Sequence, residues 1–158
     1  MVEFIDRYKP LAEYLAGQGI VVVGHDHLGH GDTAQAGEHG HYGEPNGRCH
    51  LLNDLHTMNR ILHERFPDTP IILYGHSMGS FLTRTYIIDH PEGLKGVIIS
   101  GTGQNPAAVV AAGKLMAKLE MIDNGPMYHS PTLDKLAFGS YNKKYDHVRT
   151  KLDWLTRD

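Results

Sequence analysis

Three short apolar runs, at residues 20–23, 71–74 and 97–100, are spaced along the first two thirds of the chain. Each run is continuous and rich in β-branched residues, whereas a strand with one solvated face would alternate apolar and polar positions. Continuous runs of this kind are typical of parallel strands that are covered on both faces. The pattern therefore predicts three parallel strands.

Helical spacing occupies the segments between these runs. Pro10 is well placed in the first turn of a short helix ahead of the first strand, and residues 81–89 form another helical run. Strands and helices that alternate in this way indicate an α/β architecture with a doubly wound parallel sheet, whose ligand chemistry collects at the carboxyl ends of the strands. Five apolar side chains mark one face of a longer helix: Leu51, Leu55, Met58, Leu62 and Phe66.

The character of the chain changes after residue 103. Residues 107–121 and 133–138 favour helices, a turn region lies between them at 126–131, and no further apolar strand run follows. We therefore expect two parts, an α/β core over residues 1–103 and a mostly helical region over residues 104–158.

The most informative local sequence is Gly75-His76-Ser77-Met78-Gly79, which lies between the second strand run and the helix that follows it. A G-x-S-x-G sequence in this context is typical of a nucleophile elbow, a strained turn that projects the serine hydroxyl above the end of the sheet. The flanking glycines give the neighbouring backbone room to pass. We therefore expect Ser77 to be a nucleophile, held in an elbow that includes Gly75, His76 and Gly79.

The amino-acid composition of the chain argues against several classes of binding partner. The chain of 158 residues has a formal net charge of −3 and no run of Lys or Arg, which argues against nucleic acid or an anionic membrane surface. Its single cysteine cannot form an internal disulfide, and no stretch approaches the ~18 apolar residues of a membrane span. The expectation is a cytoplasmic protein with a small-molecule substrate, and its oligomeric state stays open.

Four segments together resemble one family. They are Arg7-Tyr8 with the helix that follows, Asp-His-Leu-Gly-His-Gly at 26–31, the elbow at 75–79, and Leu-Asp-Trp-Leu-Thr-Arg-Asp at 152–158. On these residues the chain resembles the α/β-hydrolase superfamily, and within it the monoacylglycerol lipase and lysophospholipase branch that is grouped with S33 serine aminopeptidases. The resemblance covers nearly the whole chain. It implies a partial α/β-hydrolase fold, with residues 104–158 as the start of a helical cap.

The resemblance also implies a function. Proteins of this branch are serine hydrolases of carboxylic esters such as monoacylglycerols or lysophospholipids, and they need no cofactor or metal. Ser77 would form an acyl-enzyme, and the backbone N–H of Met78 would stabilise the oxyanion. Met1, by its place in the family pattern, would hold the second oxyanion amide, although as a chain terminus it carries a flexible ammonium group. Four cap residues would line an acyl-chain tunnel or form the cap core: Leu115, Met116, Leu119 and Met121.

Departures from the family pattern predict a fragment. In the family, a strand ending in His-Gly precedes the segment that begins here, and the acid and base of the triad follow the cap. The absent strand would lie between the runs at 20–25 and 71–75. If the 158 residues are the whole molecule, these two strands must pair directly or leave backbone groups unsatisfied. We therefore expect an unstable chain without its own triad acid and base, unless another chain completes the sheet.

Two other functions stay open. The first is an inactive fragment or pseudoenzyme that at most binds an acyl ligand. The second is a metallohydrolase, because His25, His27 and His30 have the H-x-H-x-x-H spacing from which imidazoles can converge on zinc. Gly29 occupies the position where the metallo-β-lactamase type carries an aspartate, and a metal site would leave the elbow unexplained. The simplest interpretation of these histidines is a loop beside the mouth of the site.

Overall fold

The computed structural model describes residues 3–37, 39–144 and 150. The chain separates into two compact units, Met1–Gly103 and Gln104–Asp158. The first unit contains both strands, and the described part of the second contains helices and turns. The assignment of the second unit as a cap stays a prediction.

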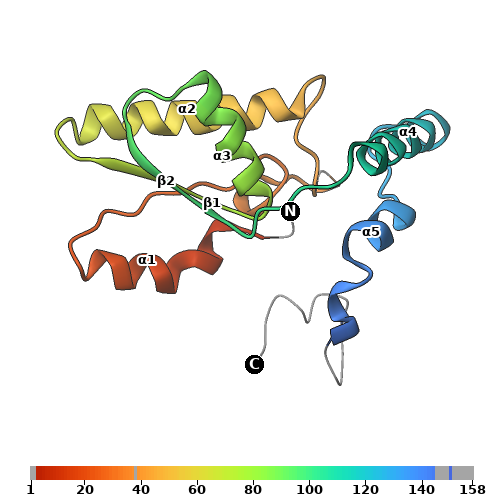
Figure 1. Ribbon diagram of the computed structural model, residues 1–158, viewed down its shortest axis with the longest axis horizontal. Coiled ribbons are helices and arrows are strands. Elements are labelled where there is room, and N and C mark those ends of the chain that lie inside the picture. The colour runs from red at the N-terminus through yellow and green to blue at the C-terminus, as the bar shows by residue number, and fades with distance from the viewer. Residues whose placement is uncertain (1–2, 38, 145–149, 151–158) are drawn as a thin grey trace. The chain divides into compact units, whose positions relative to one another are not determined.

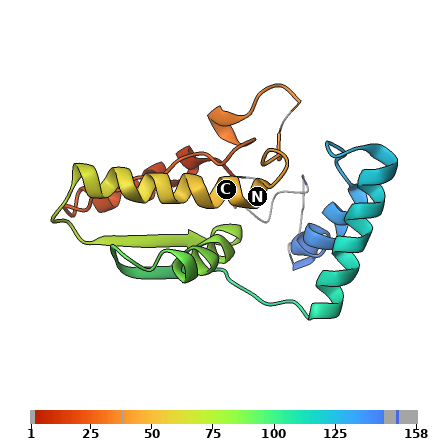
Figure 2. The same cartoon turned by 90° about the horizontal axis from the view of Figure 1, so that it is seen from above.

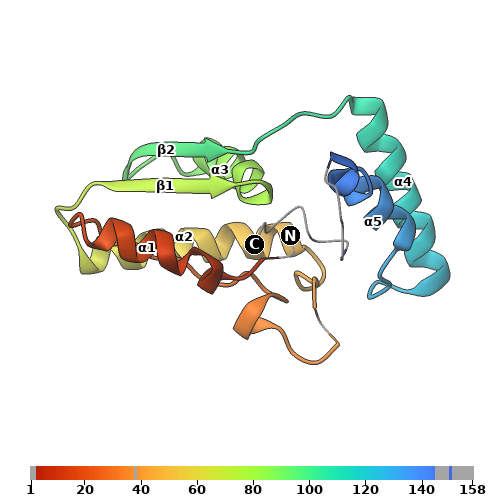
Figure 3. The same cartoon turned by 90° about the horizontal axis from the view of Figure 1, so that it is seen from below.

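A parallel pair of strands forms the centre of the first unit. β1 (Ile71–His76) pairs with β2 (Leu94–Ser100) along its length, with one shift of register between Ile71 and Ile72. The two strands lie side by side and run in the same direction (Figure 2, Figure 3). Two of the three predicted parallel strands are thus confirmed, and β2 begins three residues ahead of the apolar run at 97–100.

Three helices flank this pair. In the view of Figure 1, α1 (Lys9–Ala16) lies below the strands, and α2 (Gly47–Arg65) and α3 (Met78–Asp89) lie above them. Each of them lies where the helical spacing predicted a helix. Two 3-10 turns, at Ile5–Tyr8 and Gly31–Thr33, belong to the same unit.

The strand predicted at residues 20–23 is wrong. Residues 20–27 form neither helix nor strand, and the apolar side chains from Ile20 to Val23 are between 42% and 59% exposed. A strand requires hydrogen bonds to a neighbour, and among the described residues β1 pairs on one edge only, with β2. Direct pairing of the run at 20–23 with β1 therefore does not occur, and the backbone of that run stays outside the sheet.

Tyr86 is the main buried contact between α2 and α3. Its side chain is 1% exposed, and its hydroxyl oxygen accepts a hydrogen bond of 3.1 Å from Asn59 Nδ2 on α2. The same hydroxyl forms a 3.2 Å hydrogen bond with His56 Nδ1, and the imidazole of His56 stacks on that of His90 with ring centroids 4.2 Å apart. Because a buried hydroxyl needs partners, this network fixes how α3 lies against α2.

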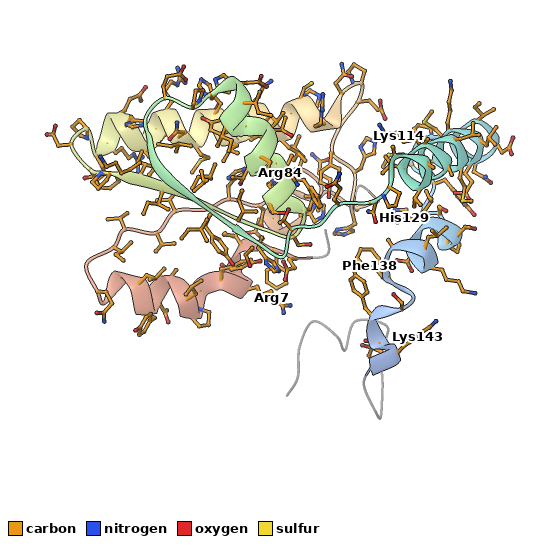
Figure 4. The ribbon with its side chains drawn as sticks, viewed as in Figure 1. Arg7, Arg84, Lys114, His129, Phe138 and Lys143 are labelled. Atoms are coloured by element: carbon orange, nitrogen blue, oxygen red, sulfur yellow. The ribbon has the colours of Figure 1, made fainter. Side chains whose placement is uncertain are left out.

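The second unit contains α4 (Ala107–Asn124), α5 (Pro131–Phe138) and a 3-10 turn at Tyr141–Lys144. Ser130 caps α5, because its hydroxyl accepts a 3.0 Å hydrogen bond from the backbone N–H of Leu133. At the other end of α5, the ring of Phe138 meets that of Tyr141 edge-on at 5.8 Å (Figure 4). Neither α4 nor α5 has a buried residue. No helix in the described ranges has both the length and the apolar character that crossing a membrane requires.

Tyr86→Phe tests the helix contact. The substitution keeps the ring and removes the hydroxyl, which leaves His56 Nδ1 and Asn59 Nδ2 without this partner. We expect the free energy of unfolding, measured by urea denaturation, to fall by about 1–2 kcal/mol. Tyr14→Phe is the matched control, because Tyr14 is 68% exposed and its change should stay within about 0.5 kcal/mol. Equal effects of the two substitutions would contradict a role for the Tyr86 hydroxyl.

Candidate active site

Ser77 forms the turn between β1 and α3. Its backbone angles are φ 52° and ψ −117°, and among the described residues it is the only non-glycine residue with a positive φ. This conformation costs a residue with a Cβ on the order of 1–3 kcal/mol, so it persists only where the surrounding structure holds it. The structure therefore contains a strained strand-to-helix turn of the kind that the motif predicts. The catalytic role of Ser77 stays a prediction.

The turn is anchored by the neighbouring strand and by a close backbone approach. Ser77 N–H donates a 2.9 Å hydrogen bond to the carbonyl of Ser100, the last residue of β2. A Cβ on Gly75 would overlap Thr83 Oγ1 and would lie 2.5 Å from the carbonyl oxygen of Gly79. Among the described residues, a Cβ on Gly79 would meet nothing within 4 Å. Only the first glycine of the motif is therefore required by close packing.

His76 is held by β2 and not by the nucleophile. Its Nδ1 lies 3.2 Å from Ser100 Oγ, and its ring packs against Gly101, where an added Cβ would lie 3.0 Å from His76 Cε1. Among the described residues, no hydrogen bond joins the Ser77 hydroxyl to an imidazole. The described residues therefore bring together the serine and its elbow, and they place no base on it.

Met78 begins α3, directly after Ser77. Its N–H belongs to the first turn of the helix, where backbone donors have no partner within the helix and the helix dipole is positive. This is the position at which an oxyanion would be stabilised. Met1, the second amide that the resemblance implies, lies outside the described residues.

Tyr42 contacts Met78 from the glycine-rich loop at residues 26–46, and no sequence pattern marked it as a site residue. Its hydroxyl donates a 3.1 Å hydrogen bond to Met78 Sδ, and its ring stacks on that of His30 at 5.2 Å and 14°. Burial raises the pKa of the Tyr42 phenol. The contact joins positions 36 residues apart. An aromatic residue among glycines was the only sequence signal that could have drawn attention to it.

Asp26 organises the start of the same loop. Its carboxylate accepts hydrogen bonds from the backbone N–H groups of Ile5, at 2.7 Å, and Asp32, at 3.0 Å. Gly31 has φ 48°, and a Cβ there would overlap the Asp26 carboxylate. Asp26 therefore stabilises a turn, and both of its carboxylate oxygens accept hydrogen bonds from backbone N–H groups.

The histidines at the start of this loop do not form a metal site in the described residues. The rings of His25 and His27 meet edge-on at 5.5 Å. His25 Nε2 and His27 Nδ1 are buried and have no hydrogen-bond partner in the part of the chain that the structure describes. Burial, with His25 and His30 nearby, lowers the pKa of His27 to about 4. Within residues 3–37, 39–144 and 150, no three His, Cys, Asp or Glu side chains gather closely enough to hold a metal ion.

A shallow pocket of about 380 Å³ lies elsewhere in the first unit. It is lined by α2 and by the end of α3, with Tyr86, His90 and Glu92 among its residues. His90 follows the last residue of α3, so a rise of about 1.5 Å per residue puts it roughly 20 Å along the helix axis from Ser77. Ligand chemistry in α/β folds collects at the carboxyl ends of the strands, where Ser77 lies. We therefore assign the candidate site to the elbow and not to this pocket.

Gly75→Ala and Gly79→Ala form a matched pair that tests the elbow geometry. The alanine at 75 would overlap Thr83, so we expect the free energy of unfolding to fall by about 1–3 kcal/mol. The alanine at 79 has open space in a helix, so we expect no loss and a gain of up to about 1 kcal/mol. Urea denaturation of both variants measures the difference, and a larger loss for Gly79→Ala would refute the geometry.

His27 makes stability depend on pH. Its folded-state pKa of about 4 lies below the ordinary 6.5, so between these values the unfolded chain binds more protons than the folded one. The contribution is full above pH 6.5 and is lost as the pH falls toward 4. We expect urea denaturation from pH 7.5 to 4.5 to show this decline, and His27→Gln to flatten it. His39→Gln, at an exposed position, is the control and should keep the decline.

This chain resembles known proteins in both sequence and fold. The family model described as serine aminopeptidase, S33, matches residues 1–158. A monoglyceride lipase homolog of monkeypox virus is 28% identical, over 92% of this chain and 50% of its own. The mouse monoglyceride lipase is also 28% identical, over 74% of this chain and 38% of its own.

A solved structure extends the likeness to the fold. A thermostable carboxyl esterase from Bacillus coagulans, in complex with glycerol, superposes with a TM-score of 0.82 and 29% identity, over 98% of this chain and 49% of the esterase. This confirms the predicted partial α/β-hydrolase fold. The chain thus spans about half the length of the first relatives it matches. Together with the matching family model, these likenesses show that the chain belongs to the serine aminopeptidase S33 family of α/β-hydrolases.

Proposed function

We propose that this chain carries the nucleophile of a serine hydrolase of carboxylic esters, and that the nucleophile is Ser77. The observation that carries the proposal is the positive φ of Ser77 at the carboxyl end of β1. A strained serine at this place projects its hydroxyl above the end of the sheet, as in a nucleophile elbow. The family supports the same reaction type, because its relatives include monoglyceride lipases.

The proposed chemistry is acyl transfer through a covalent intermediate. Ser77 Oγ attacks the ester carbonyl carbon as a general base takes its proton, and the oxyanion that forms is stabilised by Met78 N–H. The alcohol then leaves with a proton from the protonated base, and water releases the acid from the acyl-enzyme. Of these groups, the described residues contribute the nucleophile and one oxyanion donor. In the family that this chain resembles, the acid and base of the triad follow the cap in the sequence.

We propose monoacylglycerol-like or lysophospholipid-like esters as substrates. The relatives named monoglyceride lipase support this class, as does the carboxyl esterase that was solved with glycerol. Several apolar side chains of α4 are exposed, among them Leu115, Leu119 and Met121. No cofactor enters the proposed reaction.

An acyl-ligand-binding protein without activity is the second candidate. It is favoured by one observation, that no described imidazole is hydrogen-bonded to Ser77. Such a chain would keep the elbow and the apolar cap side chains and would bind an ester without cleaving it.

A fluorophosphonate probe tests the proposal on the purified chain. Catalysis by Ser77 predicts that the wild-type protein is labelled, that Ser77→Ala falls to background because its nucleophile is gone, and that Ser140→Ala keeps full labelling. Ser140 is the matched control, since it is an exposed serine of the second unit. Circular dichroism confirms that each protein is folded. Folded wild-type protein that is never labelled would reject catalysis by Ser77, and binding of a non-hydrolysable monoacylglycerol ether would then favour the second candidate.

A further inference from the structure

The peptide that joins Ser77 to Met78 carries two groups of the candidate site. A peptide bond is planar and trans, so its C=O and its N–H point in opposite directions from one rigid unit. The carbonyl of this unit belongs to Ser77, and the N–H belongs to Met78, the proposed oxyanion donor. Whatever holds the carbonyl oxygen of Ser77 therefore also sets the direction of the Met78 N–H.

Ser80 holds that carbonyl with two donors. Its hydroxyl donates a 2.6 Å hydrogen bond to Ser77 O, and its backbone N–H donates to the same oxygen at 3.0 Å. The Ser80 side chain is fully buried, at 0% relative exposure. Water therefore does not compete for the hydroxyl, and the peptide unit has no freedom to rotate without breaking both bonds.

Hydroxyl-to-carbonyl bonds of this kind also occur in ordinary helices, where they do little more than satisfy the side chain. α3 contains such a bond, from Thr85 Oγ1 to the carbonyl of Phe81 at 3.1 Å. That bond lies within the helix and is exposed to solvent. The Ser80 bond differs, because its acceptor belongs to the residue with φ 52° and to the peptide that faces the site.

A hydrogen bond to one end of a peptide also strengthens the other end. When the C=O of a peptide accepts a hydrogen bond, the peptide becomes more polarised, and its N–H becomes a better hydrogen-bond donor. Here the Ser80 hydroxyl donates to the carbonyl of Ser77, so the N–H of Met78 would be the stronger donor.

We propose that Ser80 is a positioning residue for the oxyanion donor: its hydroxyl aims and polarises the Ser77–Met78 peptide. This inference rests on the proposed function of Ser77 and Met78, and it adds a residue that does not touch the substrate. Neither the G-x-S-x-G pattern nor the helical spacing marks Ser80, because its hydroxyl acts through the backbone.

Three variants of the full chain test the proposal. Ser80→Ala removes the hydroxyl, and Ser80→Cys fills the same buried space with a thiol, which is a weaker donor. Thr85→Val removes the comparable hydroxyl five residues further along α3. The first readout is fluorophosphonate labelling of Ser77, analysed as separate binding and bond-forming constants.

We expect the bond-forming rate constant to fall about tenfold in Ser80→Ala, less than the 10²–10³ reported for complete loss of an oxyanion donor, because the N–H remains but is less well aimed. The probe's binding constant should stay within about twofold, because Ser80 does not touch the probe. Ser80→Cys should recover part of the rate, and Thr85→Val should keep it. Unchanged labelling in Ser80→Ala, or a loss that Ser80→Cys does not relieve, would overturn the proposal.

The second readout does not need catalysis. In ¹H–¹⁵N spectra of the folded chain, the Met78 amide should shift upfield in Ser80→Ala and stay in place in Thr85→Val, because only the first variant unloads the carbonyl of its peptide. If the wild-type chain takes no label, the proposed function fails for this chain while the amide shift still decides the role of Ser80. A Met78 amide that does not move in Ser80→Ala overturns the inference.

Discussion

The candidate site depends on the parallel pairing of β1 with β2. This pairing brings the carbonyl of Ser100 to the N–H of Ser77, so the last residue of one strand holds the first residue beyond the other. A serine with a positive φ is unfavourable by itself. It is held by the strand pairing and by a backbone that passes so close to Thr83 and Gly79 that position 75 has no room for a Cβ. The strain is therefore a property of the whole strand-helix-strand unit.

Much of the fold could be predicted from the sequence. The apolar runs at 71–74 and 97–100 lie in the two strands, and the helical spacing marked α1, α2, α3, α4 and α5, with boundaries that differ by a few residues. These signals are local, because a continuous β-branched run favours a strand and apolar residues at helical spacing favour a helix. The predicted coverage of both strand faces is wrong for the described residues, since Ile72 is 58% exposed and Ile98 is 52% exposed. The G-x-S-x-G context likewise located the strained turn, since its geometry is set within a few residues.

The run at 20–23 shows where local reasoning ends. Its composition is as strand-like as that of 71–74, yet only the second run has a neighbour to pair with among the described residues. A β-branched run indicates that a segment favours an extended conformation. The backbone hydrogen bonds that make it a strand depend on a second segment that lies beside it. The contact of Tyr42 with Met78 could not be predicted for the same reason. It joins residues 36 positions apart, and an irregular loop has no hydrophobic periodicity that would indicate such a contact.

The segment from residue 71 to residue 100 contains β1, α3 and β2 in direct succession, together with all the hydrogen bonds that hold Ser77. The longest of these hydrogen bonds, from Ser77 N–H to the carbonyl of Ser100, closes the crossover loop that contains α3, and the entropy lost in closing a loop grows only slowly with its length. Parallel pairing across a crossover helix is a non-local contact, and such pairing forms more slowly than contacts within one helix. The strained turn is therefore complete only after both strands and the helix between them have assembled.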